Sequence, residues 1–159
     1  MKRSRRTDNK GFSLLEVVIV VAIIAILAAI GIPRMSQGSR GAANSAIKGD
    51  LATLRNAVDI YAAEHDGTLP AENNIVNQLT KYTDRNGVVS DTKTAPYIYG
   101  PYIRSIPPLP VGPDNRKGST GIGASDANGV GWLYTVSTGK ITPNTGTSKD
   151  DSNVLYTSY

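Results

Sequence analysis

The chain of 159 residues contains no cysteine and a single histidine, His65. The lack of cysteine excludes thiol catalysis, cysteine-based zinc sites and disulfide staples. One histidine argues against histidine-based triads and metal clusters. The sequence also contains no Gly-rich phosphate loop, Ser/His/Asp grouping or spaced pair of carboxylates, so we do not expect an enzyme. A small domain without disulfides must be held together by its core, by a metal or by packing against other copies of itself.

The net charge of +4 lies entirely in the first ten residues. Their basic side chains outnumber the one acid, Asp8, and are Lys2, Arg3, Arg5, Arg6 and Lys10. The remaining chain is neutral, which argues against nucleic-acid binding, because that function needs a basic face on the folded domain. A basic block before a first apolar helix instead keeps the N-terminus in the cytoplasm. We therefore expect the chain after Pro33 to lie outside the cytoplasm.

An apolar run follows, in which Ser13 and Glu16 are the only polar residues between Phe12 and Ile32. As a helix these residues extend about 31 Å, enough to cross a bilayer core of about 30 Å. The run is too long for a secretory signal, and no cleavage site follows it. A carboxylate within hydrocarbon costs several kcal/mol unless it is paired or protonated, so Glu16 marks a functional site. The alternative is a glutamate near the membrane interface that only reaches out to water.

The segment Gly11-Phe12-Ser13-Leu14-Leu15-Glu16 resembles the processing motif of type IV pilins and type II secretion pseudopilins. The resemblance implies that a prepilin peptidase cuts after Gly11 and N-methylates Phe12. Residues 1–11 would then be a leader peptide, and the mature chain would comprise residues 12–159. It also implies a single-pass precursor in the bacterial inner membrane, an assembly platform there as a partner, and a periplasmic or cell-surface filament as the product.

Cleavage at Gly11 would give Glu16 a partner. The new α-amino group of Phe12 is a cation one helical turn away from the carboxylate. In a filament, Glu16 of one subunit could neutralise the Phe12 ammonium of a neighbour. A misaligned subunit would leave two charges unpaired in an apolar core, so this pair would set the axial register.

The helical pattern resumes after Pro33, so this proline predicts a kink rather than an end. Apolar residues recur at steps of three and four along residues 43–61, with charged and polar residues between them. These residues are Ala43, Ile47, Leu51, Leu54, Val58 and Tyr61. The sequence thus predicts one long helix over about 12–64, with an amphipathic second half. His65-Asp66-Gly67 would end it, with His65 favoured there by the helix dipole.

The C-terminal half predicts a small antiparallel sheet. We expect a short helix after residue 71, with one apolar face. Loops are expected at 88–95 and 112–130. Strands are expected at 132–136 and 141–142, joined by a hairpin turn, and a final strand at 154–159. The predicted helix face consists of Ile75, Val76, Leu79 and Tyr82, and the predicted sheet face consists of Trp132, Tyr134 and Val136. The fold class is therefore α+β and type IV pilin-like, a long kinked N-terminal helix packed against this sheet. The predicted parts are the leader (1–11), the membrane or filament-core half-helix (12–33) and an extracytoplasmic domain (34–159).

Two loops bear on calcium binding and on the subtype within the family that the motif resembles. Asp126-Ala127-Asn128-Gly129 has the alternating oxygen ligands of a calcium loop but lacks a downstream bidentate glutamate. Major pseudopilins bind calcium in C-terminal loops, so Asp126 and Asn128 are weak calcium candidates, and an Asx-rich turn is the favoured interpretation. Residues 100–110 resemble a loop of the major pseudopilin (protein G-like), although Val111-Gly112 replaces the Trp-Gly that follows it there.

Two functions compete. The favoured one is a structural subunit that polymerises into a type IV pilus or a type II secretion pseudopilus, and residues 102–110 together with the absent cysteine pair favour the pseudopilus. The alternative is a monomeric, membrane-anchored binding module. That alternative leaves Glu16 and the Gly11–Phe12 junction without a role.

Overall fold

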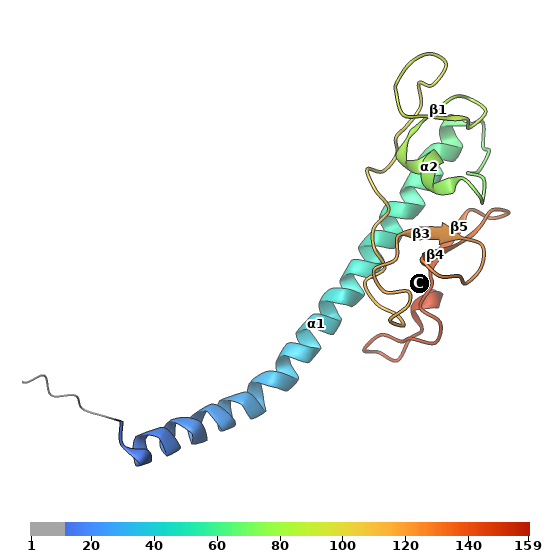
Figure 1. The fold of residues 1–159 in the computed structure, drawn as a ribbon. Coiled ribbons are helices and arrows are strands. Elements are labelled where there is room, and N and C mark those ends of the chain that lie inside the picture. The colour runs from blue at the N-terminus through green and yellow to red at the C-terminus, as the bar shows by residue number, and fades with distance from the viewer. Residues whose placement is uncertain (1–11) are drawn as a thin grey trace, which may run out of the picture. The chain divides into compact units, whose positions relative to one another are not determined.

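The computed structural model describes residues 12–159, except for the side chains of residues 31–37 (Figure 1). The elements follow one another as α1 (Leu14–Glu64), α2 (Ile75–Thr80), β1 (Tyr82–Thr83), β2 (Val89–Ser90), β3 (Gly121–Gly123), β4 (Val130–Thr135), β5 (Lys140–Pro143) and the 3₁₀ turn η1 (Tyr156–Ser158). This order of one long helix followed by short strands confirms the predicted α+β, pilin-like class.

Helix α1 is continuous from Leu14 to Glu64, so the helical assignment runs through Pro33 as predicted. The kink expected at Pro33 falls among the side chains that are not described, and it stays a prediction. The helix ends as the sequence predicts: Asp66 and Gly67 have φ values of 55° and 81°. The Ala62 carbonyl of the last turn accepts from the Gly67 amide at 2.8 Å and from the His65 amide at 3.2 Å, so this carbonyl is satisfied at the helix end.

The chain divides into two compact units, Met1–Ser39 and Arg40–Tyr159, here called unit 1 and unit 2. Within the described residues, none of the helices combines the length and the hydropathy that crossing a bilayer requires. The predicted boundaries after residues 11 and 33 are not tested by this division and stay predictions.

The core of unit 2 forms where the apolar stripe of α1 meets the sheet. Its fully buried side chains come from α1, α2, β4, β5 and the segment before β3, and they include Ile47, Leu51, Leu54, Val58, Tyr61, Leu79, Leu109, Trp132, Tyr134 and Ile141. The polar atoms of the two buried aromatics on β4 are satisfied. Trp132 donates to the Pro107 carbonyl at 2.8 Å, and Tyr134 donates to the Pro70 carbonyl at 3.0 Å. The predicted packing of the amphipathic half of the helix is therefore confirmed.

The three-stranded sheet, in the order β3-β4-β5, is mixed rather than antiparallel. Strands β4 and β5 form the predicted hairpin, but β3 pairs with β4 in parallel, within a segment predicted to be a loop. Glycines permit this pairing. A Cβ on Gly131 would lie 2.2 Å from the Ser119 carbonyl oxygen, and one on Gly121 would lie 2.4 Å from that of Gly129. Val136 also differs from its prediction: it follows the last residue of β4 and is 41% exposed.

The final strand predicted at 154–159 is wrong. Of those residues, Tyr156–Ser158 form the turn η1, and Leu155 makes an isolated bridge with Lys149. The turn follows a loop organised by Asp150, whose carboxylate accepts from the amides of Ser152 and Val154 at 2.9 and 2.8 Å. Residues three apart lie on one side of a 3₁₀ turn, whereas in a strand they would face opposite ways. The turn thus lets Tyr156 and Tyr159 meet edge to face, with ring centroids 5.7 Å apart.

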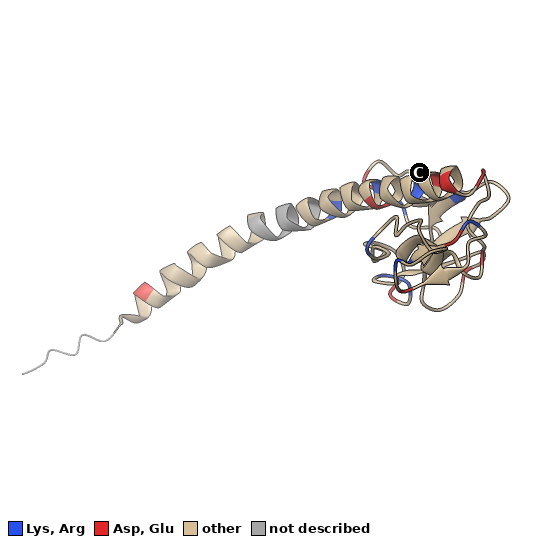
Figure 2. Cartoon of the chain, turned by 90° about the horizontal axis from the view of Figure 1, so that it is seen from above, with Lys and Arg blue, Asp and Glu red and all other residues tan. Residues whose placement is uncertain are grey.

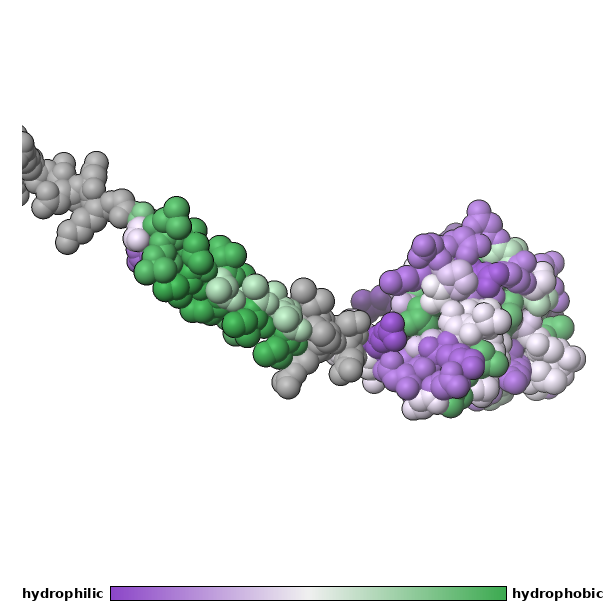
Figure 3. Space-filling model, turned by 90° about the horizontal axis from the view of Figure 1, so that it is seen from below, coloured by the Kyte–Doolittle hydropathy of each residue, from purple (hydrophilic) through white to green (hydrophobic). Residues whose placement is uncertain are grey.

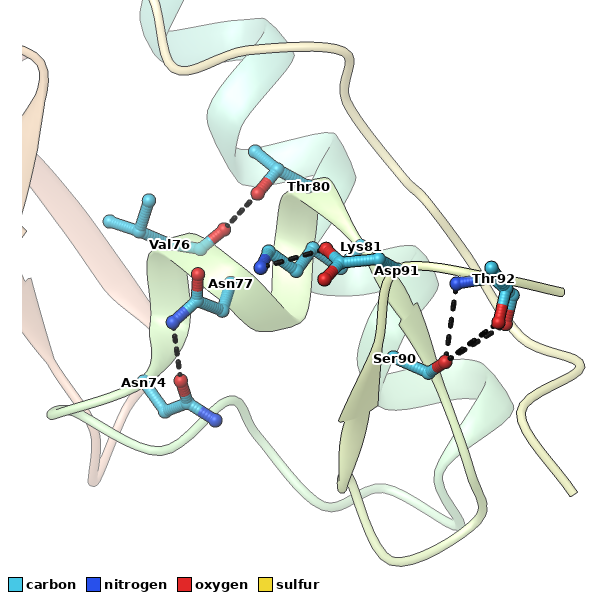
Figure 4. A network of polar contacts seen from close by, with 8 residues as sticks. All are labelled: Asn74, Val76, Asn77, Thr80, Lys81, Ser90, Asp91 and Thr92. Carbon is cyan, nitrogen blue, oxygen red and sulfur yellow. Dashed lines mark hydrogen bonds and ion pairs between the residues drawn. The ribbon is translucent and has the colours of Figure 1, made fainter.

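Helix α2 forms where expected, and Ile75 and Leu79 are buried. Tyr82, predicted on its apolar face, belongs instead to β1, which pairs with β2 inside the predicted 88–95 loop. Polar contacts brace this region (Figure 4): Lys81 pairs with Asp91 at 2.9 Å, and Asn77 donates to Asn74 at 2.9 Å. Because these groups are mostly exposed, they add little stability, and the buried apolar residues hold α2 in place.

Candidate functional site

The residues predicted to carry function lie at the start of the described chain. Phe12 precedes the first turn of α1, and its side chain is 85% exposed. Gly11, the predicted cleavage residue, lies outside the described residues, so the Gly11–Phe12 junction and the methylation of Phe12 stay predictions.

Glu16 lies in the first turn of α1, where the partial positive charge of the helix N-terminus favours an anion. A groove of about 310 Å³ contains this side chain and is otherwise lined by Phe12, Val17, Val20 and Val21. Residues four apart share one side of a helix, which places Glu16 and Val20 in one row, and Phe12 lines the same groove from before the helix. Among residues 12–30, no hydrogen bond or ion pair engages the Glu16 carboxylate. The arrangement is therefore an unpaired anion with an apolar rim.

Apolar side chains surround this groove on every side of the helix. Between residues 12 and 30 the exposed fractions of the large apolar side chains run from 49% at Val20 to 85% at Phe12. Figure 3 shows this surface as an apolar stretch, and Figure 2 shows how sparse charged residues are along it. An exposed apolar surface of this extent marks a site of contact with a membrane or with other protein.

The calcium candidates Asp126 and Asn128 stay predictions, and the structure shows which protein groups contact Asp126. The Asp126 carboxylate accepts from Arg116 through one oxygen and from the Asn144 side-chain amide, at 3.0 Å, through the other. Asn128 is exposed. Within the described chain, no group of three or more acidic or histidine side chains is placed to hold a metal ion. Asp126 thus tethers its loop to Arg116 and to the residue after β5, a role that the sequence did not reveal.

A second contact missed by sequence reasoning fastens the C-terminal segment to α1. The Arg55 guanidinium donates to the carbonyls of Ile141 and Tyr159 at 3.1 and 2.8 Å, and the Lys48 ammonium lies 4.9 Å from the Tyr159 ring centroid. The Tyr159 hydroxyl donates to Asp150, and this bond is the main reason why the pKa of the Asp150 carboxyl is lowered. The Asp-Ser-Asn sequence after Asp150 is an Asx-turn signal that could have indicated this loop.

His65 directly follows the last residue of α1, as predicted for a helix-end histidine, and it is buried. It is 2% exposed, and its ring stacks on Tyr61 with centroids 3.9 Å apart. Both ring nitrogens have polar partners: Nδ1 lies 2.8 Å from the Tyr61 carbonyl, and Nε2 lies 3.0 Å from the Asp84 carbonyl. Specific hydrogen bonds therefore position this ring.

Comparison with known proteins covers the N-terminal region. Residues 6–32 match the family model described as "Prokaryotic N-terminal methylation motif". Neither the curated proteins nor the solved structures contain a match to this chain. The matched segment includes Gly11, Phe12 and Glu16 as well as the apolar helix up to Ile32. It is the leader motif of structural pilin subunits and not the signature of an enzyme family.

The motif is typical of membrane-anchored precursors that a prepilin peptidase processes. The resemblance inferred from six residues is thus confirmed at the level of the motif, while the protein G-like subtype stays a prediction. The chain therefore carries, over residues 6–32, the N-terminal methylation motif found in type IV pilin and pseudopilin precursors.

Proposed function

We propose that this protein is a structural subunit that polymerises into a helical filament through residues 12–32, after cleavage behind Gly11 and methylation of Phe12. One observation carries the proposal. The first part of α1 has an apolar surface, and each large apolar side chain on it is roughly half exposed or more. A lone soluble subunit could not keep such a surface in water. In the precursor the inner membrane would cover it, and in the filament the same segment of other subunits would.

Glu16 supports assembly rather than simple anchoring. A plain membrane anchor gains nothing from a carboxylate, which costs several kcal/mol in hydrocarbon when it is unpaired. Removal of the leader would create a cation on Phe12, which borders the same groove as Glu16. Head-to-tail contacts between copies would place the amine of one subunit beside the Glu16 of the next, and such contacts generate open filaments.

The experiment is intact-mass measurement of the protein recovered from membranes and from sheared surface or periplasmic filaments. The expected mass corresponds to residues 12–159 plus one methyl group. A protein that retains residues 1–11 in filaments would contradict the proposal. A processed protein found only as a membrane-bound monomer would instead support the alternative of an anchored binding module.

The kind of filament is a separate question. The residues from Tyr102 to Pro110 and the absence of cysteine lead us to propose the pseudopilus of a type II secretion system rather than a type IV pilus. Deleting the gene separates the two, since loss of secreted enzymes with intact surface pili indicates a pseudopilus. Loss of surface pili with normal secretion would contradict this choice and leave the filament proposal intact.

A further inference from the structure

Two Asn-Gly pairs in unit 2 lie in turns with different surroundings. Asn86-Gly87 lies between β1 and β2, and Asn128-Gly129 lies between β3 and β4. In both turns the glycine has a positive φ, of 78° at Gly87 and 80° at Gly129. Because the dipeptide is the same in both places, the fold decides any difference in reactivity between the two pairs.

An asparagine that precedes a glycine can react with the main chain. Once hydroxide removes the proton of the glycine amide, that nitrogen bonds to the side-chain carbonyl carbon of the asparagine, and the side-chain nitrogen takes up a proton and leaves as ammonia. Water then opens the five-membered succinimide at either of its two carbonyls, which gives aspartate or isoaspartate. Glycine favours the attack because it has no side chain to obstruct it. The reaction therefore needs a glycine amide that is free to lose its proton and to move towards the asparagine.

Hydrogen bonds hold the first pair. Gly87 is buried, its amide donates to the Asp84 carbonyl at 3.0 Å, and its carbonyl accepts from Gln78 at 2.9 Å. The Asp84 carboxylate also accepts from the amides of Asn86 and Val88, at 2.9 and 2.8 Å. The Gly87 amide can attack only after this turn opens, so the fold protects Asn86.

The second pair lacks this protection. Asn128 and Gly129 are both exposed, and no heavy atom beyond the chain neighbours lies within 4 Å of the position of a Cβ on Gly129. Across the described residues 12–159, none accepts a hydrogen bond from the Gly129 amide. We propose that Asn128 is a site of spontaneous deamidation through the Gly129 amide, whereas the fold protects Asn86 from the same reaction.

The isoaspartate product at residue 128 affects the start of the sheet, because it adds a methylene to the main chain directly before Gly129. The Gly129 carbonyl accepts from the Gly121 amide at 3.0 Å, beside the first pair of β3 and β4, Gly121 and Val130. The backbones approach closely here, since a Cβ on Gly121 would lie 2.4 Å from the Gly129 carbonyl oxygen. Isoaspartate therefore loosens the start of this parallel pairing, whereas aspartate keeps the normal main chain and leaves the pairing intact.

The test compares the folded full chain in detergent micelles with the same chain unfolded in denaturant, both incubated at mildly alkaline pH. A lysine-specific protease then releases residues 82–93 and 118–140, each with a single asparagine, and a mass gain of about 1 Da marks deamidation. In the unfolded chain both asparagines should react at similar rates. In the folded chain Asn128 should keep most of that rate, and Asn86 should react at least about tenfold more slowly. A folded chain in which Asn86 reacts as fast as Asn128, or in which both are equally suppressed, would overturn the proposal.

Two variants separate the effect of the fold from that of the local sequence. Asp84→Ala removes the carboxylate that holds the first turn, so Asn86 should react several-fold faster while the rate of Asn128 stays unchanged. Gly129→Ala places a side chain beside the attacking nitrogen and should slow the reaction of Asn128 by at least about tenfold. An unchanged rate at Asn128 in Gly129→Ala, or at Asn86 in Asp84→Ala, would contradict the proposal. The folded and unfolded wild-type chains provide the decision should Asp84→Ala fail to fold.

Hydrogen exchange tests the effect on the sheet. The wild-type fraction that carries isoaspartate at residue 128 should lose protection at the Gly121 amide. Asn128→Asp is the matched control, because it has the same added charge on a normal main chain, and it should keep this protection. Equal protection of Gly121 in both would contradict the predicted link between this turn and the β3–β4 pairing.

Discussion

The two halves of α1 treat apolar residues in opposite ways. Between residues 12 and 30, every large apolar side chain is about half exposed or more, and Glu16 is the only charged residue of that segment. From Ile47 onward, one stripe of apolar residues is buried in unit 2, charged residues take other positions, and Ile60 is the large apolar residue of α1 there that is exposed, at 40%. The second half therefore gets its partners from its own chain. Under the proposed function, the first half would find its partners in lipid or in other copies, and the difference would separate the folding surface from the assembly surface.

The largest expected effect comes from truncating one residue in each half. Leu54 is 0% exposed and Ile23 is 51% exposed. Leu54→Ala should lower the free energy of unfolding of unit 2 by about 2–5 kcal/mol, because it leaves a cavity in the core. Ile23→Ala should leave that energy unchanged. Denaturant unfolding of the full chain in detergent, followed by Trp132 fluorescence, measures both, and a comparable loss in Ile23→Ala would erase the distinction.

Sequence reasoning succeeded where the signal is local. The apolar steps from Ile47 to Tyr61 predicted the buried stripe, and Asp66-Gly67 predicted the end of α1 because glycine readily takes the left-handed conformation found there. The run from residue 12 and the placement of Glu16 predicted the motif that the family comparison confirms.

Sequence reasoning failed where distant segments decide the structure. Strand β3 contains two glycines and lacks a strand pattern, and it pairs because Gly131 lets the Ser119 backbone approach closely. The turn η1 depends on the contacts of Tyr159 with Arg55 and Asp150. The sequence around Asp126 favoured an Asx-rich turn over a calcium loop, but it did not reveal the partners of Asp126, which are a guanidinium and an amide from other segments. None of these pairings leaves a local pattern.

A second prediction concerns what holds unit 2 together in place of a disulfide or a metal. Arg116→Met would remove the largely buried guanidinium that pairs with the half-exposed Asp126 carboxylate, which should cost about 1 kcal/mol of unfolding free energy. Arg85→Met removes an exposed pair with Asp66 and should cost less than about 1 kcal/mol. Addition of calcium or a chelator should leave the wild-type midpoint unchanged. A calcium-dependent rise would instead support the candidates Asp126 and Asn128.

Glycine replacement sharpens the comparison with smaller effects. Gly49 lies within the folded half of α1 and has no heavy atom within 4 Å of the position of a Cβ, so Gly49→Ala should stabilise unit 2 by about 0.5–1 kcal/mol. Gly67→Ala is the matched control, because its φ of 81° suits glycine, and it should destabilise by about 1 kcal/mol. Thermal unfolding measures both, and a destabilised Gly49→Ala would mean that this exposed helix face needs glycine for contacts with a partner.

The smallest effect concerns pH. The Tyr159 hydrogen bond lowers the pKa of Asp150, so ionised Asp150 binds its partners more tightly than the protonated form does. The stability that this hydrogen bond contributes is present above the usual aspartate pKa of about 4. It is lost as the pH falls through the lowered pKa of Asp150. Acidification below pH 4 should therefore loosen the loop before η1, seen as NMR shifts of Tyr156 and Tyr159. Asp150→Asn should remove this acid transition, whereas Asp114→Asn at an exposed position should preserve it.

The most direct test of the two-surface account uses the absence of cysteine. Ile23→Cys places one thiol on the apolar half of α1, and Ser125→Cys places one on an exposed loop of unit 2. In detergent, a maleimide should label both variants. In intact filaments, Ile23→Cys should be protected and should become reactive again after dissociation, while Ser125→Cys stays reactive throughout. Equal labelling of Ile23→Cys in intact and dissociated filaments would contradict the claim that the exposed apolar half of α1 is the assembly surface.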